Sequence, residues 1–516
     1  MASNNPSSPP EAIAHRGFIT LSVMLATIMQ ALDTTIANVA LPHMQGSMSA
    51  TQDQISWVLT SYIVAAAIFM PLTGFMTARF GRKRIFIWSV IGFTIASMLC
   101  GAAQDLSQIV LFRMLQGVFG AALVPLSQSV MLDSYPKEKH GSAMALWGMG
   151  VMVGPILGPM LGGWLTEHYS WRWVFYINLP LGLLAWFGLS AYLKETEIEH
   201  SRRFDLLGFA YLSLAIASLQ MMLDRGESLN WFSSREVLIE GVVAGLSMYL
   251  FIAHIFTHKH PFLEPGLFKD RNFTLGLLAI FIVGIILLAT MALLPPFMQS
   301  LMGYPVIEIG LLLTPRGVGT MFAMFMVGKL SGKVDPRYLI VFGLSLTVLS
   351  LWEMTFFNTD ITGWGIVRNG MMQGFGLGFV FVPLSTITFS TLAQHYRNEG
   401  TALFSLMRNI GSSIGISLVI TNLAQNTQAN HAAFADYITP YSLPLRQAVE
   451  AGVYDLDTAQ GLMAINGEVT RQAATLAYLQ DFRLMMWVTL CAVPLILLLR
   501  KPAKQPSATD AHTAME

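Results

Sequence analysis

Two charged residues stand in apolar segments long enough to cross a membrane. Asp33 lies in "QALDTTIANVALP" (30–42), and the residues between it and Arg16 carry no charge. Arg113 opens "RMLQGVFGAA" inside another apolar run. An ionised side chain at the bilayer centre costs about 2.5–3.5 kcal/mol on insertion scales, so such residues face protein or water and mark functional sites. We therefore take both residues as the leading candidates for chemistry.

The helical face that carries Asp33 is small and polar. Residues three and four positions apart share a face of a helix, and this one holds Ala26, Gln30, Asp33, Ala37 and Ala40. Burial disfavours the ionised carboxylate, so we expect Asp33 to take up and release a proton, or to meet a cationic substrate. The alternative is a structural aspartate bound to a neighbouring helix.

Arg113 shares its face with Gln116, Gly117 and Gly120. The glycines allow another helix to approach closely. The guanidinium stays protonated and needs an anion or backbone carbonyls as partners. We predict a role in proton coupling; the alternative is a static hydrogen-bonded hub.

The elements that position these residues are membrane-spanning helices. The chain is 54% hydrophobic and only 12% charged, and apolar runs of about 20 residues recur along it. We predict an all-α polytopic membrane protein with fourteen spans. Its formal net charge of zero gives no indication of nucleic-acid binding, and its two cysteines, Cys100 and Cys491, fall in predicted spans and suggest no disulfide framework.

Basic residues fix the expected orientation. They concentrate in the connections on one side, among them "RFGRKR" (79–84), which places that side and both termini in the cytoplasm. The polar N-terminal segment resembles a cytoplasmic tail and not a signal peptide. We expect Arg79, Arg82 and Lys83 to help gate the cytoplasmic side.

Three sequence features occur twice. "GFMTARFGRKR", "RMLQGVFGAA" and "GSAMALWGMG" are followed by "GKLSGKVDPRY", "RNGMMQGFGLG" and "GTALFSLMRNIG". The offset is about 255 residues each time, which favours two parallel halves that rock about a midplane site. We predict these segments: a tail (1–16), a six-helix half (17–193), two inserted spans with linkers (194–270), a second six-helix half (271–500) containing an external loop (421–481), and a tail (501–516).

These motifs resemble the major facilitator superfamily, and within it the fourteen-span drug:proton antiporters of the EmrB/QacA type. "LDTTIANVALP", "GFMTARFGRKR", "RMLQG" and "GMGVMVGPILGPMLGG" resemble four motifs of that branch. The resemblance implies that spans 1 and 4 are neighbours, so that Asp33 lies near Arg113. It also implies an EmrA-like membrane-fusion adaptor and a TolC-like outer-membrane channel as partners. One position departs from the pattern, because Ala78 stands where the family's loop motif has an acid.

The remaining candidates concern packing and substrate. Gly150, Gly154, Gly158 and Gly162 recur every four residues, with Pro155 after one of them, and predict a tightly packed seam between two helices. We expect Glu353 and Arg368 to pair near the external side. Arg316 could contact an anionic substrate or a carboxylate across the cavity. The predicted substrate cavity residues are Gln30, Trp57, Tyr62, Gln116 and Arg316.

The sequence thus predicts a proton-coupled exporter of small amphiphilic molecules in a bacterial inner membrane, working by alternating access. It has no GxxxxGK[ST] motif for ATP, and no metal, cofactor or enzymatic activity is expected. One alternative is an exporter of an endogenous fatty acid or siderophore. Another is a non-transporting receptor or scaffold, against which the buried Asp and Arg argue.

Overall fold

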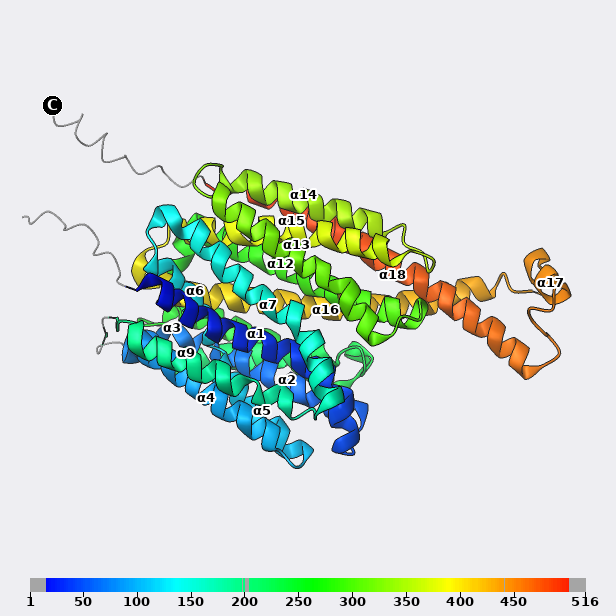
Figure 1. Ribbon diagram of the computed structural model, residues 1–516, viewed down its shortest axis with the longest axis horizontal. Helices are drawn as coiled ribbons and strands as arrows, with labels where there is room; N and C mark the ends of the chain where they lie inside the picture. Colours follow the sequence, from blue (N-terminus) through cyan, green and yellow to red (C-terminus); the bar gives the residue numbers. More distant parts are fainter. Residues whose placement is uncertain (1–14, 197, 200–203, 440, 501–516) are drawn as a thin grey trace, which may run out of the picture.

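The protein is a bundle of long helices that run roughly along one axis (Figure 1). The computed structural model describes all residues except 1–14, 197, 200–203, 440 and 501–516. The two predicted tails, apart from residues 15 and 16, therefore lie outside the described residues.

The helices of the first half and of the inserted spans are these: α1 (Arg16–Ser47), α2 (Gln52–Phe69), α3 (Leu72–Phe80), α4 (Arg82–Ala102), α5 (Leu106–Gly120), α6 (Leu123–Ser134), α7 (His140–His168), α8 (Trp173–Tyr176), α9 (Asn178–Tyr192), α10 (Leu206–Arg225) and α11 (Arg235–Thr257). Those of the second half are α12 (Arg271–Pro296), α13 (Val306–Leu330), α14 (Pro336–Met354), α15 (Gly363–Ser390), α16 (Arg397–Ala435), α17 (Leu443–Glu450) and α18 (Ala459–Leu497).

The number of spans agrees with the prediction. In the described part of the chain, 13 helical segments are long and apolar enough to cross a membrane, and α2 and α3, bent by 55° where they join, form a fourteenth. Pro71 stands at that bend, where a proline removes a backbone donor. The fold is the predicted one, with two six-helix halves and two inserted spans, α10 and α11.

We call the end of the bundle that carries Arg82 and Lys83 the basic end. Helices of the two halves meet there. Ser142 Oγ of α7 donates to the Gly328 carbonyl of α13 at 2.8 Å, and Ser129 Oγ of α6 donates to Asn398 Oδ1 of α16 at 2.6 Å. The halves are therefore held together at this end.

A helical hairpin projects from the opposite end of the bundle. Figure 1 shows α16 and α18 continuing past the other helices, with α17 at the tip. Asn430 Nδ2 of α16 donates to the Ala473 carbonyl of α18 at 3.3 Å, and a small apolar core sits near the tip, formed by Leu445, Ile465 and Val469.

The hairpin covers most of the segment that the sequence predicts as a loop. Helix α18 runs without a break from this segment into the last span. The extension of α16 to Ala435 is not predicted, although residues 421–435 hold several alanines and neither Gly nor Pro, a composition that sustains a helix. Asp481, placed at the edge of the expected loop, is buried inside α18 and accepts a 2.5 Å hydrogen bond from Asn422.

Candidate functional site

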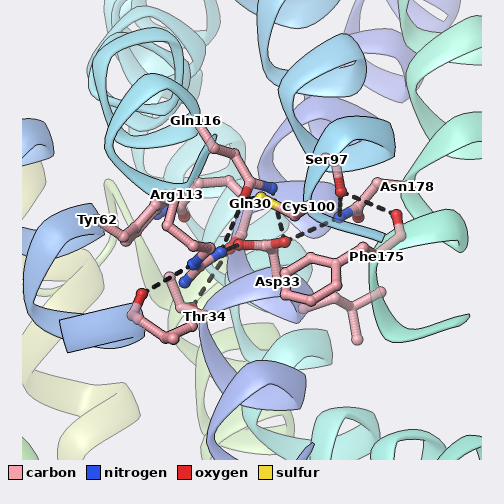
Figure 2. A network of polar contacts seen from close by, with 12 residues as sticks. Gln30, Asp33, Thr34, Tyr62, Ser97, Cys100, Arg113, Gln116, Phe175 and Asn178 are labelled. Carbon is pink, nitrogen blue, oxygen red and sulfur yellow. Dashed lines mark hydrogen bonds and ion pairs between the residues drawn. The ribbon is translucent and has the colours of Figure 1, made fainter. Parts of the chain in front are cut away.

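Asp33 lies at the centre of a buried polar cluster. Arg113 Nη1 donates to its Oδ2 at 2.6 Å, and Gln116 Nε2 and Asn178 Nδ2 donate to its Oδ1 at 2.8 and 2.9 Å. Figure 2 shows these side chains converging on the carboxylate from different helices. Asp33 and Arg113 are each 1% exposed. Three side-chain donors thus take the place of water around the Asp33 carboxylate.

Arg113 is held on several sides. Its Nε donates to the Val58 carbonyl at 3.1 Å and its Nη1 also donates to Gln116 Oε1 at 2.8 Å. Its guanidinium carbon lies 4.4 Å from the centroid of the Tyr62 ring, a cation–π distance. These contacts give the guanidinium partners that do not depend on Asp33, so the arginine can remain buried when the ion pair breaks.

A second layer of polar groups fixes the Asn178 amide. Asn178 Nδ2 donates to Ser97 Oγ at 2.9 Å, and Ser97 Oγ donates to the Phe175 carbonyl at 2.8 Å. The sequence analysis missed Asn178 and Ser97. A signal was available, because Asn178 is an amide within the apolar run "YINLPLG". Burying an amide without a hydrogen bond is costly, so such a residue is expected to have polar partners.

The glycine seam of α7 sets the position of α1. Thr35 Oγ1 of α1 donates to the Gly154 carbonyl at 3.0 Å, and a Cβ at Gly154 would lie 2.5 Å from the carbonyl carbon and oxygen of Ala31. Gly150 and Gly162 face Met24 and Ile36 of the same helix. The seam thus holds α1 against α7 in the turns that contain Asp33, and α7 stays one helix through Pro155.

The predicted cavity residues separate into different places. Gln30 Nε2 donates to the Tyr62 hydroxyl at 3.2 Å, so both border the Asp33 cluster together with Gln116. Trp57 lies elsewhere, with the Arg225 guanidinium of inserted helix α10 at 5.6 Å from its ring. The structure therefore brings together Gln30, Tyr62 and Gln116 and leaves Trp57 at the contact with the inserted spans.

Arg316 belongs to the second half. It is 7% exposed, and its Nη2 donates to Thr290 Oγ1 at 2.9 Å and to the Leu287 carbonyl at 3.3 Å, both on α12. No carboxylate of the described residues pairs with it. Glu353 and Arg368 form the expected ion pair with each other, on a more exposed part of α14 and α15.

An ion network joins the halves at the basic end. Asp133 of α6 pairs with Arg82 of α4 and with Arg397 of α16. Asp133 and Arg397 were not predicted, because their contact spans 264 positions of sequence. An acid at position 78 is therefore not required for an ion pair in this region, since Asp133 supplies the carboxylate.

The neighbouring basic residues have separate roles. Lys83 Nζ donates to the Ser190 carbonyl at 2.7 Å, which ties the start of α4 to α9. Arg79 stands in the last turn of α3. The Ala78 carbonyl accepts a 2.9 Å hydrogen bond from the Glu199 backbone N–H, so the connection after α9 folds back on this loop.

Asp205, His254 and His258 lie close enough to hold a metal ion, a cluster that the sequence analysis did not expect. The Asp205 carboxylate is already occupied. It accepts hydrogen bonds from the Gly208 and Phe262 backbone N–H groups at 2.9 Å each and from His254 Nε2 at 3.0 Å. Burial alone would raise the pKa of Asp205, but these hydrogen bonds outweigh burial and lower it. The contacts account for the cluster as a cap of α10 that is tied to α11.

Fold and site together define a polytopic membrane transporter of two six-helix halves, with a buried acid–arginine pair in the first. The family model described as the Major Facilitator Superfamily matches residues 23–416. The chain belongs to the major facilitator superfamily, in its fourteen-span branch.

Relatives match over most of their length. The chain is 36% identical to the fatty acid resistance protein FarB of Neisseria gonorrhoeae, over 96% of this chain and 98% of FarB. It is 37% identical to the multidrug export protein EmrB of Escherichia coli K12, over 86% of each chain. A crystal structure of the human organic anion transporter MFSD10 superposes with a TM-score of 0.57 at 12% identity, covering 93% of this chain and 100% of that chain. At that identity the likeness concerns the fold alone.

Proposed function

We propose that this protein is a proton-coupled exporter of small amphiphilic molecules in a bacterial inner membrane, with both termini in the cytoplasm. The relatives FarB and EmrB, named for fatty acid resistance and multidrug export, support the export of such molecules. Proton coupling is supported mainly by the ion pair between Asp33 and Arg113, whose side chains are each only 1% exposed to solvent.

The pair supplies a switch with two states. With Asp33 ionised, the carboxylate binds Arg113, Gln116 and Asn178 and holds α1 to α5 and α9. A proton that arrives from outside neutralises Asp33 and weakens the contact with Arg113, which keeps its bonds to Val58 and Gln116. Protons moving inward release about 2.3 kcal/mol per charge per 100 mV, and this free energy drives the exchange of states.

The ion network of the basic end acts as the cytoplasmic gate in this scheme. It connects α4 and α6 of the first half to α16 of the second. Rocking of the halves toward the inward-open state must break the contact between Asp133 and Arg397. The described arrangement corresponds to a state closed at the basic end.

The projecting hairpin is the proposed contact for a periplasmic adaptor of the membrane-fusion type, which would lead to an outer-membrane channel. Its length, its position at the end away from the gate and the exposed side chains at its tip support this role. Tyr437 and Tyr441 are 78% and 88% exposed, and exposed aromatic residues are typical of interfaces.

Purified protein in proteoliposomes tests the proposed function. An imposed pH gradient should drive transport of a fluorescent amphiphile by the wild-type protein, and a collapsed gradient should stop it. Asp33→Asn keeps the size and hydrogen bonding of the side chain but cannot titrate, so it should bind substrate and lose gradient-driven transport. Undiminished transport by this variant would contradict Asp33 as the proton carrier.

A further inference from the structure

The inserted spans connect the two halves at the end of the bundle away from the basic end. Helix α10 follows the connection that folds back on Ala78, so it begins at the basic end. Its last residue lies about 28 Å further along, at 1.5 Å per residue. Helix α10 packs against both α2 of the first half and α16 of the second. Its polar contacts with these two helices lie at the far end.

Two side-chain contacts join α10 to α2. Thr60 Oγ1 of α2 donates a hydrogen bond to Asp224 Oδ2 of α10, and Thr60 is only 4% exposed. The guanidinium carbon of Arg225 lies 5.6 Å from the centroid of the Trp57 ring. Residues 57 and 60 share one face of α2, because they are three positions apart. This face of α2 is therefore bound to the end of α10.

The same turn of α2 holds the arginine of the proposed proton site. The Val58 carbonyl accepts the 3.1 Å hydrogen bond from Arg113 Nε, and the Tyr62 ring centroid lies 4.4 Å from the guanidinium carbon. Val58 and Tyr62 are four residues apart and share a face of α2 that differs from the face of Thr60. This turn thus contacts Arg113 on one face and α10 on another, so a displacement of Arg113 can reach α10 through a single helical turn.

The link to the second half is the indole of Trp231, which follows α10. Its Nε1 donates to Thr421 Oγ1 of α16 at 2.9 Å. Its backbone N–H donates to the Gly226 carbonyl at 2.6 Å, and a Cβ at Gly226 would lie 2.9 Å from the indole, so the ring rests on the end of α10. Asn230 and Trp231 have φ of 56° and 51°, which is rare for a bulky residue such as Trp. A backbone held in this region indicates that surrounding contacts fix the indole in place.

Rocking of the halves moves α2 relative to α16, so a rigid α10 cannot keep its contacts with both helices unchanged. We propose that the inserted spans pass movement at the proton site to the second half, with Thr60, Asp224 and Trp231 as positioning residues. A displacement of Arg113 would move α2, and the contacts with α10 and Trp231 would carry that movement to α16. The proposal rests on the proposed function and gives the two inserted spans a part in it.

A distance between the halves tests this connection without transport. Spin labels at Ser107→Cys of α5 and Gln428→Cys of α16 stand at exposed positions of the first and second halves. The exposed Cys491 is replaced by Ser, and Cys100 is buried. Pulsed electron–electron resonance then measures the distance between the labels in detergent-purified protein. Asp33→Asn, which neutralises the carboxylate that binds Arg113, should shift this distance.

The shift should depend on the two contacts of the inserted spans. Thr60→Val and Trp231→Phe each remove one hydrogen bond and keep the shape of the side chain. In either background Asp33→Asn should shift the label distance much less than it does with the contacts intact. Asp224→Asn can still accept the bond from Thr60, so this variant should keep most of the shift. Trp364→Phe is the matched control, because this indole is 72% exposed at the start of α15.

Transport in proteoliposomes gives a second readout. Thr60→Val and Trp231→Phe should each lower the rate of gradient-driven transport about two- to tenfold, the range expected for one hydrogen bond. Binding of the fluorescent amphiphile should stay unchanged, whereas a purely structural role would weaken both. Asp33→Asn shifts that are absent, or that are equal with and without the contacts, would overturn the proposal. Wild-type protein that shows the contact-dependent shift but no gradient-driven transport would instead count against the export function alone.

Discussion

Arg113 and Asp33 form an ion pair of 2.6 Å between α5 and α1, with both side chains 1% exposed. Buried pairs of this kind are weak evidence for stability, since desolvation of the charges offsets their attraction. Breaking one side is costly, however, because the remaining charge is left buried. In the proposed mechanism, a proton on Asp33 would break the pair reversibly and so couple proton uptake to movement of α1 against α5.

Variants of the pair should separate its charge from its geometry. Arg113→Ala leaves Asp33 without its counter-charge and should abolish pH-gradient-driven transport. Arg113→Lys retains the charge but loses the planar fork that contacts Asp33, Gln116 and Val58, and should retain part of the coupling. Substrate-induced proton release from detergent-solubilised protein measures the difference. Equal loss in both variants would indicate that the geometry alone matters.

Gly154→Ala should disrupt the α1–α7 seam. The added Cβ would lie 2.5 Å from the Ala31 carbonyl, and overpacking of this kind costs about 1–3 kcal/mol. We expect a lower temperature of thermal unfolding and reduced transport. Gly163→Ala is the matched control on the same helix, since a Cβ there meets nothing within 4 Å. Equal behaviour of the two variants would show that the seam does not constrain α1.

The sequence predicts the fold because apolar length, basic connections and the duplicated motifs all constrain it. It also predicts the neighbours Asp33 and Arg113, through the resemblance to a known family. Periodicity shows which face of a helix is polar but not which side chain meets it. For that reason Asn178 was missed, and the contact of Trp57 with Arg225 was not predicted. The link between Asp133 and Arg397 depends on the packing of two halves and has no local signal.

The cap of α10 gives a pH-dependent contribution to stability. The folded protein lowers the pKa of Asp205 below its ordinary value of 3.8, so the contribution is complete above that value and is lost as the pH falls through the lower folded pKa. Asp205→Asn should therefore lower the unfolding temperature at pH 7, and the difference from wild type should shrink below about pH 4. Asp105→Asn, which changes the side chain that caps α5, serves as a comparison for the unfolding temperature when a helix cap is altered elsewhere in the chain. A difference that does not change with pH would contradict this assignment.

Removal of the hairpin tip should affect the adaptor and not the membrane domain. Replacing residues 436–458 by a short Gly/Ser linker leaves the contact between Asn430 and Ala473 in place. The variant should insert and transport in proteoliposomes, yet fail to co-purify with a membrane-fusion adaptor. Tyr441→Ser, which changes a side chain 88% exposed, should weaken co-purification without altering folding. Full retention of the adaptor by both variants would exclude the tip as the contact.

The gate should open when its shared carboxylate is removed. Asp133→Asn leaves Arg82 and Arg397 without their common partner, and each charged hydrogen bond lost is worth about 1.5–3 kcal/mol. We expect the equilibrium to move toward the inward-open state. A cysteine pair introduced at Ser142 and Gly328, which are in hydrogen-bonding contact across the halves, should then cross-link less efficiently.

Ala78→Asp provides the opposing change. Ala78 lies in the last turn of α3 and Arg82 begins α4, with only Phe80, Gly81 and Arg79 between them. A carboxylate at position 78 should therefore be close enough to compete with Asp133 for Arg82. Transport should persist with an altered rate, since Asp133 still binds Arg397. In the background of Asp133→Asn, the new acid should restore part of the cross-linking at Ser142 and Gly328. If neither the rate nor the cross-linking responds to Ala78→Asp, the loop has no gating role, and the ion network of the basic end serves only to hold the fold.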